Sequence, residues 1–367
     1  MFRAWHNSLA LKVRVSPMGA LQVADVTAWD AVRVGMGFVR AEGLFGRTVF
    51  VPASSVRGVM RSFSERLLLG LGLRACDPLA PNACGMGRDA APRRIYLESC
   101  FVCRTFGSGQ LAGRVVVGDF WPWNSEAVEA TQRDECATAN RTERRGGIAI
   151  DRRTRAGALG HESEVEVVTR GAFYGDVILT NYQLWQPALI GLALREIEEG
   201  YLTIGGGSGR GFGRVLCRVV GATLRQSLDV RAAAGSLDGA SRKIIGAGGF
   251  EADELPVPDG VTWEREPLAD VARLSGKEWT RLFEALLDGP WREFVTSREK
   301  DRSNHRDTEN IEIGGEEKGG GKEEGDAGVV AGAEAGVVAD AGAVAVAETA
   351  AAEPVPAQDA APVPGDH

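Results

Sequence analysis

Four cysteines stand at a spacing that suits a metal ion. Cys76, Cys84, Cys100 and Cys103 are separated by seven, fifteen and two residues. Four thiolates form a complete tetrahedral ligand set for structural zinc. The loop from Cys76 to Cys84 contains Pro and Asn and few apolar side chains, so a metal would stabilise it. We predict a zinc site in a cysteine-rich region at residues 72–108, with reduced, partly buried thiols as the alternative.

A second cluster combines glycine with arginine between residues 204 and 214. This segment holds six glycines and two arginines. A backbone without Cβ atoms can approach a phosphate-bearing polymer closely, although glycine-rich segments also form tight turns and linkers. The predicted contact residues are Gly207, Gly209, Arg210 and Gly211.

An amphipathic helix is predicted after a short strand at residues 48–51. Its apolar residues recur at helical spacing, namely Val56, Val59, Met60, Phe63 and Leu67. Ser54 or Ser55 is the predicted N-cap, and Arg57 and Arg61 follow four residues apart. Amides, hydroxyls and cations then converge as anion binding requires. An ordinary capped helix with solvated arginines is the alternative.

Six arginines fall between Arg141 and Arg155, around the short apolar segment Ile148-Ala-Ile150. Guanidinium groups pair with phosphates and stack on bases, so this pattern favours nucleic-acid contact. A solvated charged loop is the alternative, because Glu143 and Asp151 partly neutralise the segment.

Several further elements must position these groups. Alternation predicts strands at residues 9–15, 114–120, 164–168 and 212–219, and a long apolar helix is predicted at residues 183–202. Residues 226–300 form a C-terminal extension with a capped helix at residues 275–287, which packs on the core or on a neighbouring subunit. Its apolar face comprises Trp279, Leu282, Phe283 and Leu286.

Charge separates the last part of the chain from the rest. Residues 301–367 carry 15 acidic and 4 basic residues and contain no Phe, Trp or Tyr, so we predict a disordered acidic tail rich in Gly and Ala. The whole chain has a net charge of −8, whereas residues 1–300 have 38 basic and 35 acidic residues, a net charge of +3. A mildly basic body suits nucleic-acid binding. We find neither a membrane span nor the apolar core of a signal peptide, and therefore expect a soluble, cytoplasmic protein.

The ordered combination of these segments resembles the repeat-associated mysterious protein (RAMP) superfamily, the backbone subunits of type III CRISPR effector complexes. The resemblance spans roughly residues 8–225. Four motifs carry it: Pro52-Ala-Ser-Ser-Val-Arg-Gly58, in which Ala53 replaces the usual Gly; Cys100-x-x-Cys-Arg-x-Phe-Gly107; Gly113-Arg114; and the glycines of residues 207–213.

The resemblance implies an α+β, ferredoxin-like core similar to an RNA recognition motif, with the cysteine-rich region inserted. It also implies that residues 141–160 form the thumb, a β-hairpin that crosses the duplex of guide and target. Ile148 and Ile150 would pack this hairpin, while Arg152, Arg153 and Arg155 would touch the backbone of the nucleic acid.

Active relatives cleave target RNA with an aspartate in the loop after the first strand. When Phe38-Val-Arg40 is aligned with the family pattern, that position falls on Gly35, which cannot do this chemistry. Asp30 and Asp25 lie upstream and are the remaining candidates, unless both are solvated loop carboxylates. No Ser/His/Asp set is evident in the sequence.

Two functions remain open at this point. In the first, the chain holds CRISPR guide RNA through Ser54, Ser55, Arg57, Arg61 and the glycine loop, pairs it with complementary target RNA, and assembles with other effector subunits or further copies of itself. In the second, the same fold is an endoribonuclease that uses Asp30 or Asp25 with Mg²⁺ or another divalent cation. A stand-alone processing ribonuclease is a third, weaker option, because it lacks a well-placed histidine.

Overall fold

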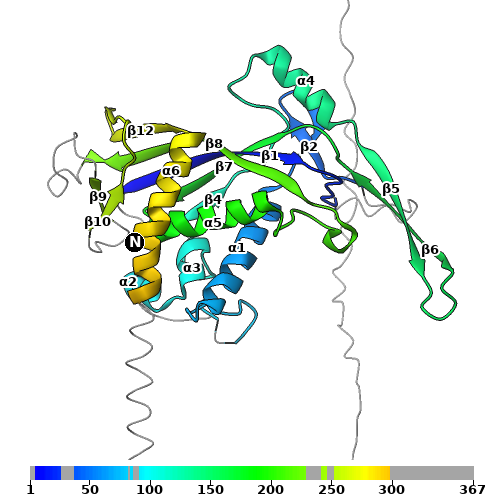
Figure 1. Cartoon of the computed structure of the whole chain (residues 1–367), viewed down its shortest axis with the longest axis horizontal. Helices are drawn as coiled ribbons and strands as arrows, with labels where there is room; N and C mark the ends of the chain where they lie inside the picture. Colours follow the sequence, from blue (N-terminus) through cyan, green and yellow to red (C-terminus); the bar gives the residue numbers. More distant parts are fainter. Residues whose placement is uncertain are drawn as a thin grey trace, which may run out of the picture. The chain divides into compact units, whose positions relative to one another are not determined.

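A six-stranded antiparallel sheet forms the centre of the computed structural model (Figure 1). The structure describes residues 5–25, 37–81, 83–85, 91–228, 241–245 and 252–297. The strands lie in the order β11-β12-β8-β1-β7-β4. Their bounds are β1 (Asn7–Pro17), β4 (Val115–Val117), β7 (Phe173–Thr180), β8 (Val215–Ser227), β11 (Glu264–Arg265) and β12 (Ala269–Ser275).

The alternation of the sequence explains why β1 lies in the middle of this sheet. Its odd-numbered residues from Leu9 to Val15 are buried, while the even-numbered ones are half-buried on the other face, the period of two expected of a strand. Leu11 is paired with Val177 of β7 on one side and with Ala222 of β8 on the other.

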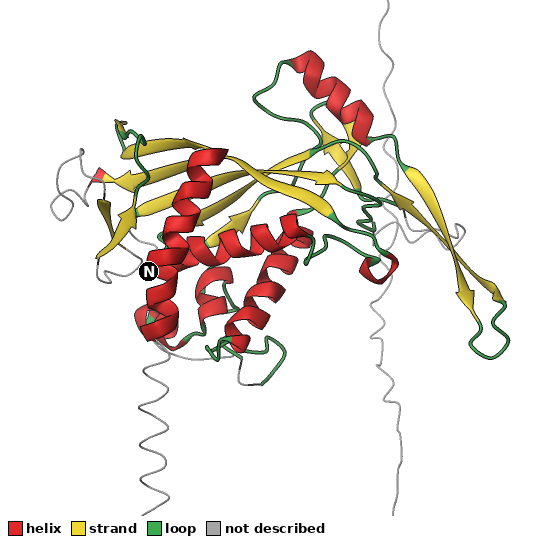
Figure 2. Ribbon diagram, in the orientation of Figure 1, coloured by secondary structure: helices red, strands yellow, loops and turns green. Residues whose placement is uncertain are grey.

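Two long helices cover the apolar face of the sheet (Figure 2). These are α1 (Ala53–Gly70) and α5 (Trp185–Glu199). The segments β1, α1, β4, β7, α5 and β8 follow one another as βαββαβ, and their strands lie in the order β8-β1-β7-β4. This arrangement is compatible with the ferredoxin-like core that the sequence predicts.

The cysteine-bearing region lies between α1 and β4. It includes the short helices α2 (Pro92–Glu98) and α3 (Phe101–Phe106), and Cys100 is the N-cap of α3. The helix α4 (Glu129–Ala139) and the hairpin of β2 (Arg40–Gly43) with β3 (Gly46–Val49) lie beyond the sheet.

A long hairpin extends away from the sheet at the end opposite β12 (Figure 1). It consists of β5 (Glu143–Ile150) and β6 (Gly157–Val167), which pair in antiparallel register from Glu143↔Val167 to Ile150↔Gly157. The predicted strand at residues 164–168 therefore falls largely in this hairpin rather than in the central sheet. The sheet position next to β1 belongs instead to β7, which the sequence analysis did not predict.

The C-terminal extension continues the same sheet. β12 pairs with β8, and α6 (Gly276–Leu286) follows it with a capping box between Ser275 and Glu278. The apolar face predicted for this helix is buried against the core. A Cβ on Gly191 of α5 would lie 2.3 Å from Phe283, so the two helices cross closely at this point. After α6 the helix continues through a π-helical segment at Leu287–Trp291 to residue 297, and the extension also contains a separate pair, β9 (Ser241–Ile245) and β10 (Ala252–Pro256).

Two local predictions are wrong. The N-cap of α1 is Pro52 rather than Ser54 or Ser55, and it makes no side-chain cap. The Oδ1 of Asp119 accepts from the amide of Ala53 (2.7 Å) and supplies a carboxylate cap from another segment. Ile148 and Ile150 do not pack the hairpin, since their side chains are 64% and 68% exposed.

No helix within the described part of the chain combines the length and the apolar character needed to cross a membrane. The predictions for Asp30, for Gly35 and for residues 301–367 lie outside the described residues.

Candidate functional site

The glycine loop lies directly against the chain segment that follows β1. The amide of Gly206 donates to the carbonyl of Gln22 (2.9 Å), and that of Gly213 donates to the carbonyl of Ala20 (2.8 Å). A Cβ on Gly205 would lie 2.0 Å from the Gln22 carbonyl oxygen, and Gly205 has a φ of +82°, so only glycine fits there. Some of the glycines thus serve close packing of backbone against backbone.

Other glycines of the loop face open space. A Cβ on Gly209 or on Gly211 would meet no atom within 4 Å. Both glycines and Arg210 are exposed, and a short turn at Ser208–Arg210 presents them. Within the loop, this tip is therefore the part that an external phosphate backbone can approach.

The same segment after β1 also contacts the base of the β5–β6 hairpin. Leu21 and Val168 exchange two backbone hydrogen bonds (both 2.9 Å). Residues 18–25 therefore join the glycine loop on one side to the hairpin on the other. The structure places the base of the hairpin, at the end opposite its arginine-bearing turn, beside the segment that contacts the glycine loop.

A half-buried carboxylate anchors the hairpin. Glu166 of β6 accepts from both terminal nitrogens of Arg40 (2.5 and 2.8 Å), from the Thr142 hydroxyl (2.5 Å) and from the Phe38 amide (2.8 Å). The hydrogen bond from Arg40, supported by those from Thr142 and Phe38, holds the pKa of Glu166 at about 2. The sequence analysis missed this anchor, since nothing in the spacing of these residues indicates that they meet.

The turn of the hairpin presents arginines to solvent. Asp151 Oδ1 accepts from the amides of Arg153 (2.7 Å) and Thr154 (2.9 Å), which fixes the turn and lowers the pKa of Asp151. Arg152, Arg153 and Arg155 are exposed, and their side chains form no hydrogen bond or ion pair with the described residues. They are available to an external anion.

The arginines of α1 are placed differently. Arg57 donates to the carbonyl of Phe106, and Arg61 donates to the carbonyl of Gly107 (3.1 Å) and to Glu65 (2.9 Å). These carbonyls end α3, so both arginines satisfy a helix C-terminus inside the protein. Ser54 is exposed and Ser55 is half-buried at the start of α1. We predicted that hydroxyls and cations converge at one end of this helix to bind an anion. The two cations, Arg57 and Arg61, already have partners within the protein.

The four predicted cysteine ligands meet. The Sγ atoms of Cys76, Cys84, Cys100 and Cys103 all lie within 4.8 Å of one another. Cys76 Sγ lies 3.5 Å from Cys103 Sγ and 3.7 Å from Cys100 Sγ, too long for disulfides. A tetrahedral zinc with bonds of about 2.3 Å would place its sulfurs roughly 3.8 Å apart, so the spacing fits a metal.

The surroundings of the cluster favour a thiolate at Cys100, whereas burial raises the pKa of Cys84. The Cys84 and Cys100 sulfurs accept backbone hydrogen bonds from the amides of Cys100 (3.2 Å) and Cys103 (3.4 Å). Close thiols share protons: hydrogen bonding with Cys103 lowers the pKa of Cys100 to about 4, while that of Cys103 rises. Arg61 Nη2 lies 3.9 Å from Cys103 Sγ and adds a positive charge. These four residues could bind a metal, and their chemistry is compatible with zinc.

The catalytic candidates are only partly placed. The amide of Asp25 donates to the carbonyl of Gly37 (3.1 Å) at the end of the segment that contacts the glycine loop. Asp30 lies outside the described residues.

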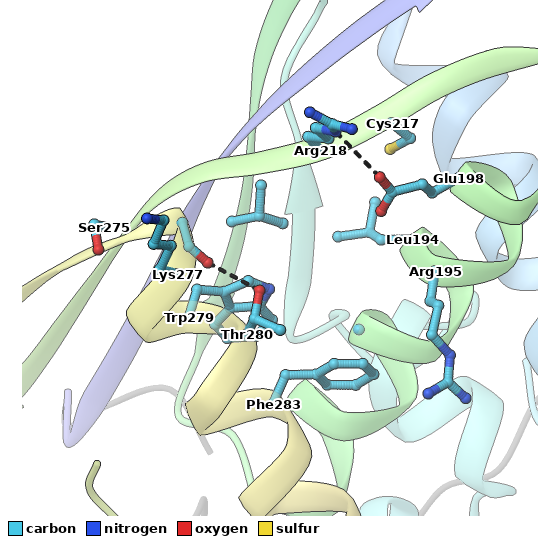
Figure 3. A pocket seen from close by; sticks show the side chains of 13 residues that line it. Leu194, Arg195, Glu198, Cys217, Arg218, Ser275, Lys277, Trp279, Thr280 and Phe283 are labelled. Atoms are coloured by element: carbon cyan, nitrogen blue, oxygen red, sulfur yellow. Dashed lines mark hydrogen bonds and ion pairs between the residues drawn. The ribbon is translucent and has the colours of Figure 1, made fainter. Parts of the chain in front are cut away.

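A groove of about 650 Å³ lies between α5, β8 and α6 (Figure 3). Leu194, Trp279 and Phe283 form its apolar wall, and its rim carries the ion pair of Arg218 with Glu198 (3.3 Å). Burial raises the pKa of Cys217 to about 12, so this thiol is not a nucleophile at neutral pH. The groove offers packing surface and no catalytic set.

Comparison with known families agrees with this geometry. The RAMP superfamily model matches residues 31–216, from the loop after β1 into β8, which is about half of the 367 residues. No curated protein matches the chain. The match includes α1, the four cysteines, the hairpin and the glycine loop. The chain belongs to the RAMP superfamily.

Proposed function

We propose that this chain is an RNA-binding backbone subunit of a type III CRISPR ribonucleoprotein, where it holds guide RNA for defence against complementary RNA. Membership of the RAMP superfamily implies a CRISPR-associated, RNA-binding role in general. The observation that carries the finer proposal is the joining of the glycine loop and the hairpin through residues 18–25. In this proposal, an extended RNA runs from the glycine loop past the base of the hairpin toward its turn.

Each segment has a different role in this proposal. The exposed tip of the glycine loop, with Gly209, Arg210 and Gly211 and the half-buried Gly207 beside them, lets a sugar-phosphate backbone approach closely. The hairpin acts as a thumb, in which Arg152, Arg153 and Arg155 contact phosphates of the guide–target duplex. Contacts of this kind position RNA without reading its sequence.

The hairpin also offers two exposed apolar side chains. Ile148 and Ile150 stand on β5 next to the arginine-bearing turn. Apolar groups that are solvated in the free protein gain most when they pack against base faces, so these side chains suit contact with the stack of a duplex. Sequence choice then comes from base pairing between guide and target, as in other RNA-guided systems.

The start of α1 has a smaller part in RNA binding. Ser54 and Ser55 can donate to a phosphate, but Asp119 already caps the Ala53 amide and brings a negative charge to the helix start. Arg57 and Arg61 support the site through α3 rather than by reaching the RNA. We also propose that Cys76, Cys84, Cys100 and Cys103 hold a structural Zn²⁺, which would fix the loop that precedes α3.

Target cleavage is the second candidate function. Asp25 stands where the segment next to the glycine loop ends, so a carboxylate is near the proposed RNA path. With Asp30 or Asp25 and a divalent cation, attack of a ribose 2′-hydroxyl on the adjacent phosphate is the reaction to test. Intact assembly with lost cleavage in Asp25→Ala or Asp30→Ala would support this function, and unchanged cleavage by both variants would contradict it.

The main proposal is tested by purifying the full chain with the products of its neighbouring genes and sequencing RNA that remains after a high-salt wash. Short RNAs with one common repeat-derived 5′ end are expected. The triple variant Arg152→Ala/Arg153→Ala/Arg155→Ala should retain less RNA, with Arg292→Ala, an exposed arginine of the C-terminal extension, as the matched control. Absence of RNA, or RNA of random sequence, would contradict a guide-holding role.

A further inference from the structure

Gln22 carries a buried side-chain amide that the functions proposed above do not use. It stands in the segment between the glycine loop and the base of the hairpin and is 4% exposed. Its backbone carbonyl accepts from the amide of Gly206, but its side chain forms no hydrogen bond with any residue that the structure describes. Buried polar side chains usually have a hydrogen-bond partner, so this amide points to a partner outside the chain, either water or a ligand.

The amide borders a place that a glycine leaves empty. A Cβ on Gly206 would lie 3.5 Å from Oε1 and 3.8 Å from Cδ of Gln22, and it would meet no other described atom within 4 Å beyond its chain neighbours. Gly206 is itself exposed and lies just before the loop tip at Ser208–Arg210. An atom of a bound polymer can therefore take the position of the missing Cβ and contact the amide.

The fold requires the glycines on either side of this place, whereas it does not require Gly206. Gly205 and Gly207 have φ angles of +82° and +78°, which favour glycine. A Cβ on Gly205 would lie 2.0 Å from the Gln22 carbonyl oxygen. A Cβ on Gly207 would lie 2.6 Å from the Phe212 ring. Gly206 has no positive φ, and its Cβ would stand at an ordinary van der Waals distance, so the glycine there serves to keep the amide accessible.

The backbone around Gln22 is fixed on its other side. Leu21 exchanges two backbone hydrogen bonds with Val168 at the base of the hairpin. The carbonyl of Val23 accepts from the amide of Val39 (2.9 Å). Leu21 and Val23 are also buried in the core. The segment that carries the amide is therefore in place before a ligand arrives, which lowers the entropic cost of binding.

The atom of the amide nearest the empty place is a hydrogen-bond acceptor. The oxygen of a carboxamide accepts and cannot donate, so a group that occupies this place must carry a donor. Phosphate and ring oxygens of a nucleic-acid backbone only accept, whereas the ribose 2′-hydroxyl both donates and accepts. The chemistry of this place thus fits a ribose better than a phosphate.

We propose that the Gln22 amide binds the 2′-hydroxyl of one ribose in the RNA that crosses the glycine loop, and that this contact distinguishes RNA from DNA. The inference rests on the proposed RNA-binding function and deepens it. Phosphate contacts at the loop tip and the hairpin turn are the same for both polymers, so they give affinity without this distinction. A hydrogen bond to the 2′-hydroxyl is available only in RNA.

The test compares binding of the full chain to a short single-stranded RNA and to the 2′-deoxy strand of the same sequence, with uracil in both. We expect the wild type to prefer the RNA. Gln22→Met keeps the approximate shape of the side chain without its polar atoms, so the preference should fall about three- to tenfold, as for the loss of one hydrogen bond. Thermal stability should be unchanged or slightly higher, because the variant buries no amide without a partner.

Gly206→Ala tests the same contact with Gln22 intact. Its methyl group would occupy the place of the 2′-hydroxyl, so the RNA preference should fall by a similar factor while stability stays the same. Gly209→Ala at the loop tip is the contrasting variant. A lost phosphate contact should lower affinity for the RNA and the 2′-deoxy strand alike and leave the preference unchanged.

The outcomes separate this inference from the function on which it rests. An RNA preference that survives in both Gln22→Met and Gly206→Ala would overturn the Gln22 contact and leave the RNA-binding role intact, as would equal binding of both strands by the wild type. Lower stability of Gln22→Met with an unchanged preference would show that the amide holds a structural water, and would also overturn the inference. A wild-type chain that binds neither strand would overturn the proposed function as well.

Discussion

Two arginine-bearing regions of this chain are alike in sequence and differ in structure. Arg57 and Arg61 on α1 donate to carbonyls at the end of α3, whereas Arg152, Arg153 and Arg155 at the hairpin turn project into solvent. Burial and the neighbouring Arg61 lower the pKa of Arg57, while no comparable burial surrounds the turn. The difference teaches that arginines in a sequence motif are exposed cations only where no internal acceptor holds them.

The first region adjoins the cysteine cluster, so loss of the proposed metal should have the largest effect. We expect Cys76→Ser to lose bound zinc and to lower the free energy of unfolding by about 3 kcal/mol or more, because the binding energy of a structural metal contributes to folding. A strong chelator should have a similar effect on the wild-type protein.

The loss of zinc is measured as the metal content of the purified protein, and the loss of stability is measured by thermal unfolding. Cys136→Ser is the matched control, because Cys136 lies outside the cluster and serine can keep its hydrogen bond to Thr48. The prediction is contradicted if the wild-type protein contains no zinc and Cys76→Ser unfolds as the wild type does. The four cysteines would then be reduced thiols that contribute by packing alone.

The second region depends on Glu166, which holds the base of the hairpin. Its folded pKa of about 2 lies below the usual 4.5, so its stabilisation is present above about pH 4.5 and is lost as the pH falls toward 2. The contribution at neutral pH is at most about 3 kcal/mol. Glu166→Gln removes it at every pH.

Denaturant unfolding at pH 7 and at pH 3.5 measures this contribution. The difference in stability between wild type and Glu166→Gln should shrink at the lower pH. Glu164→Gln is the control, since the Glu164 carboxylate pairs only with the exposed Arg144 (3.3 Å). A difference that is the same at both pH values would show that Glu166 titrates normally.

Alanine substitutions in the two sets of arginines should have smaller effects on stability. Arg61→Ala should cost about 1–2 kcal/mol, because the Gly107 carbonyl loses its charged donor. The triple alanine variant of the hairpin turn should change stability by less than about 0.5 kcal/mol. It should instead lower RNA affinity and flatten its salt dependence, by roughly 0.7 in log–log slope for each lost phosphate contact on a single strand.

Thermal unfolding and RNA binding at several salt concentrations separate these effects. The comparison fails if Arg61→Ala leaves stability unchanged and reduces RNA affinity as much as the triple variant does.

The sequence predicted those parts of the fold in which local signals agree with the tertiary structure. β1, α1, α5 and α6 have clear periodicity and lie close to their predicted bounds. The four cysteines could be grouped because their residue type restricts their chemistry, and the structure brings them together.

Other features depend on contacts that leave no local mark. β7 was missed, and Asp119 replaced the predicted serine cap from more than 60 residues away. The pairing of Arg40 with Glu166 joins positions 126 residues apart. The exposure of Ile148 and Ile150 follows from a hairpin that leaves the sheet, which strand propensity alone does not indicate.

The glycine loop gives the smallest and most specific test. Gly209→Ala adds a methyl group where nothing lies within 4 Å, so stability should stay the same or rise by at most about 1 kcal/mol. Because the methyl group would stand between the loop and a phosphate backbone, RNA affinity should fall a few-fold. Gly213→Ala is the contrasting variant: its φ is +84° and its Cβ would lie 2.4 Å from the Ile204 carbonyl oxygen, so it should destabilise the fold itself. Unchanged RNA affinity in Gly209→Ala would mean that the tip of the loop does not contact RNA, and the hairpin would then be the main contact surface.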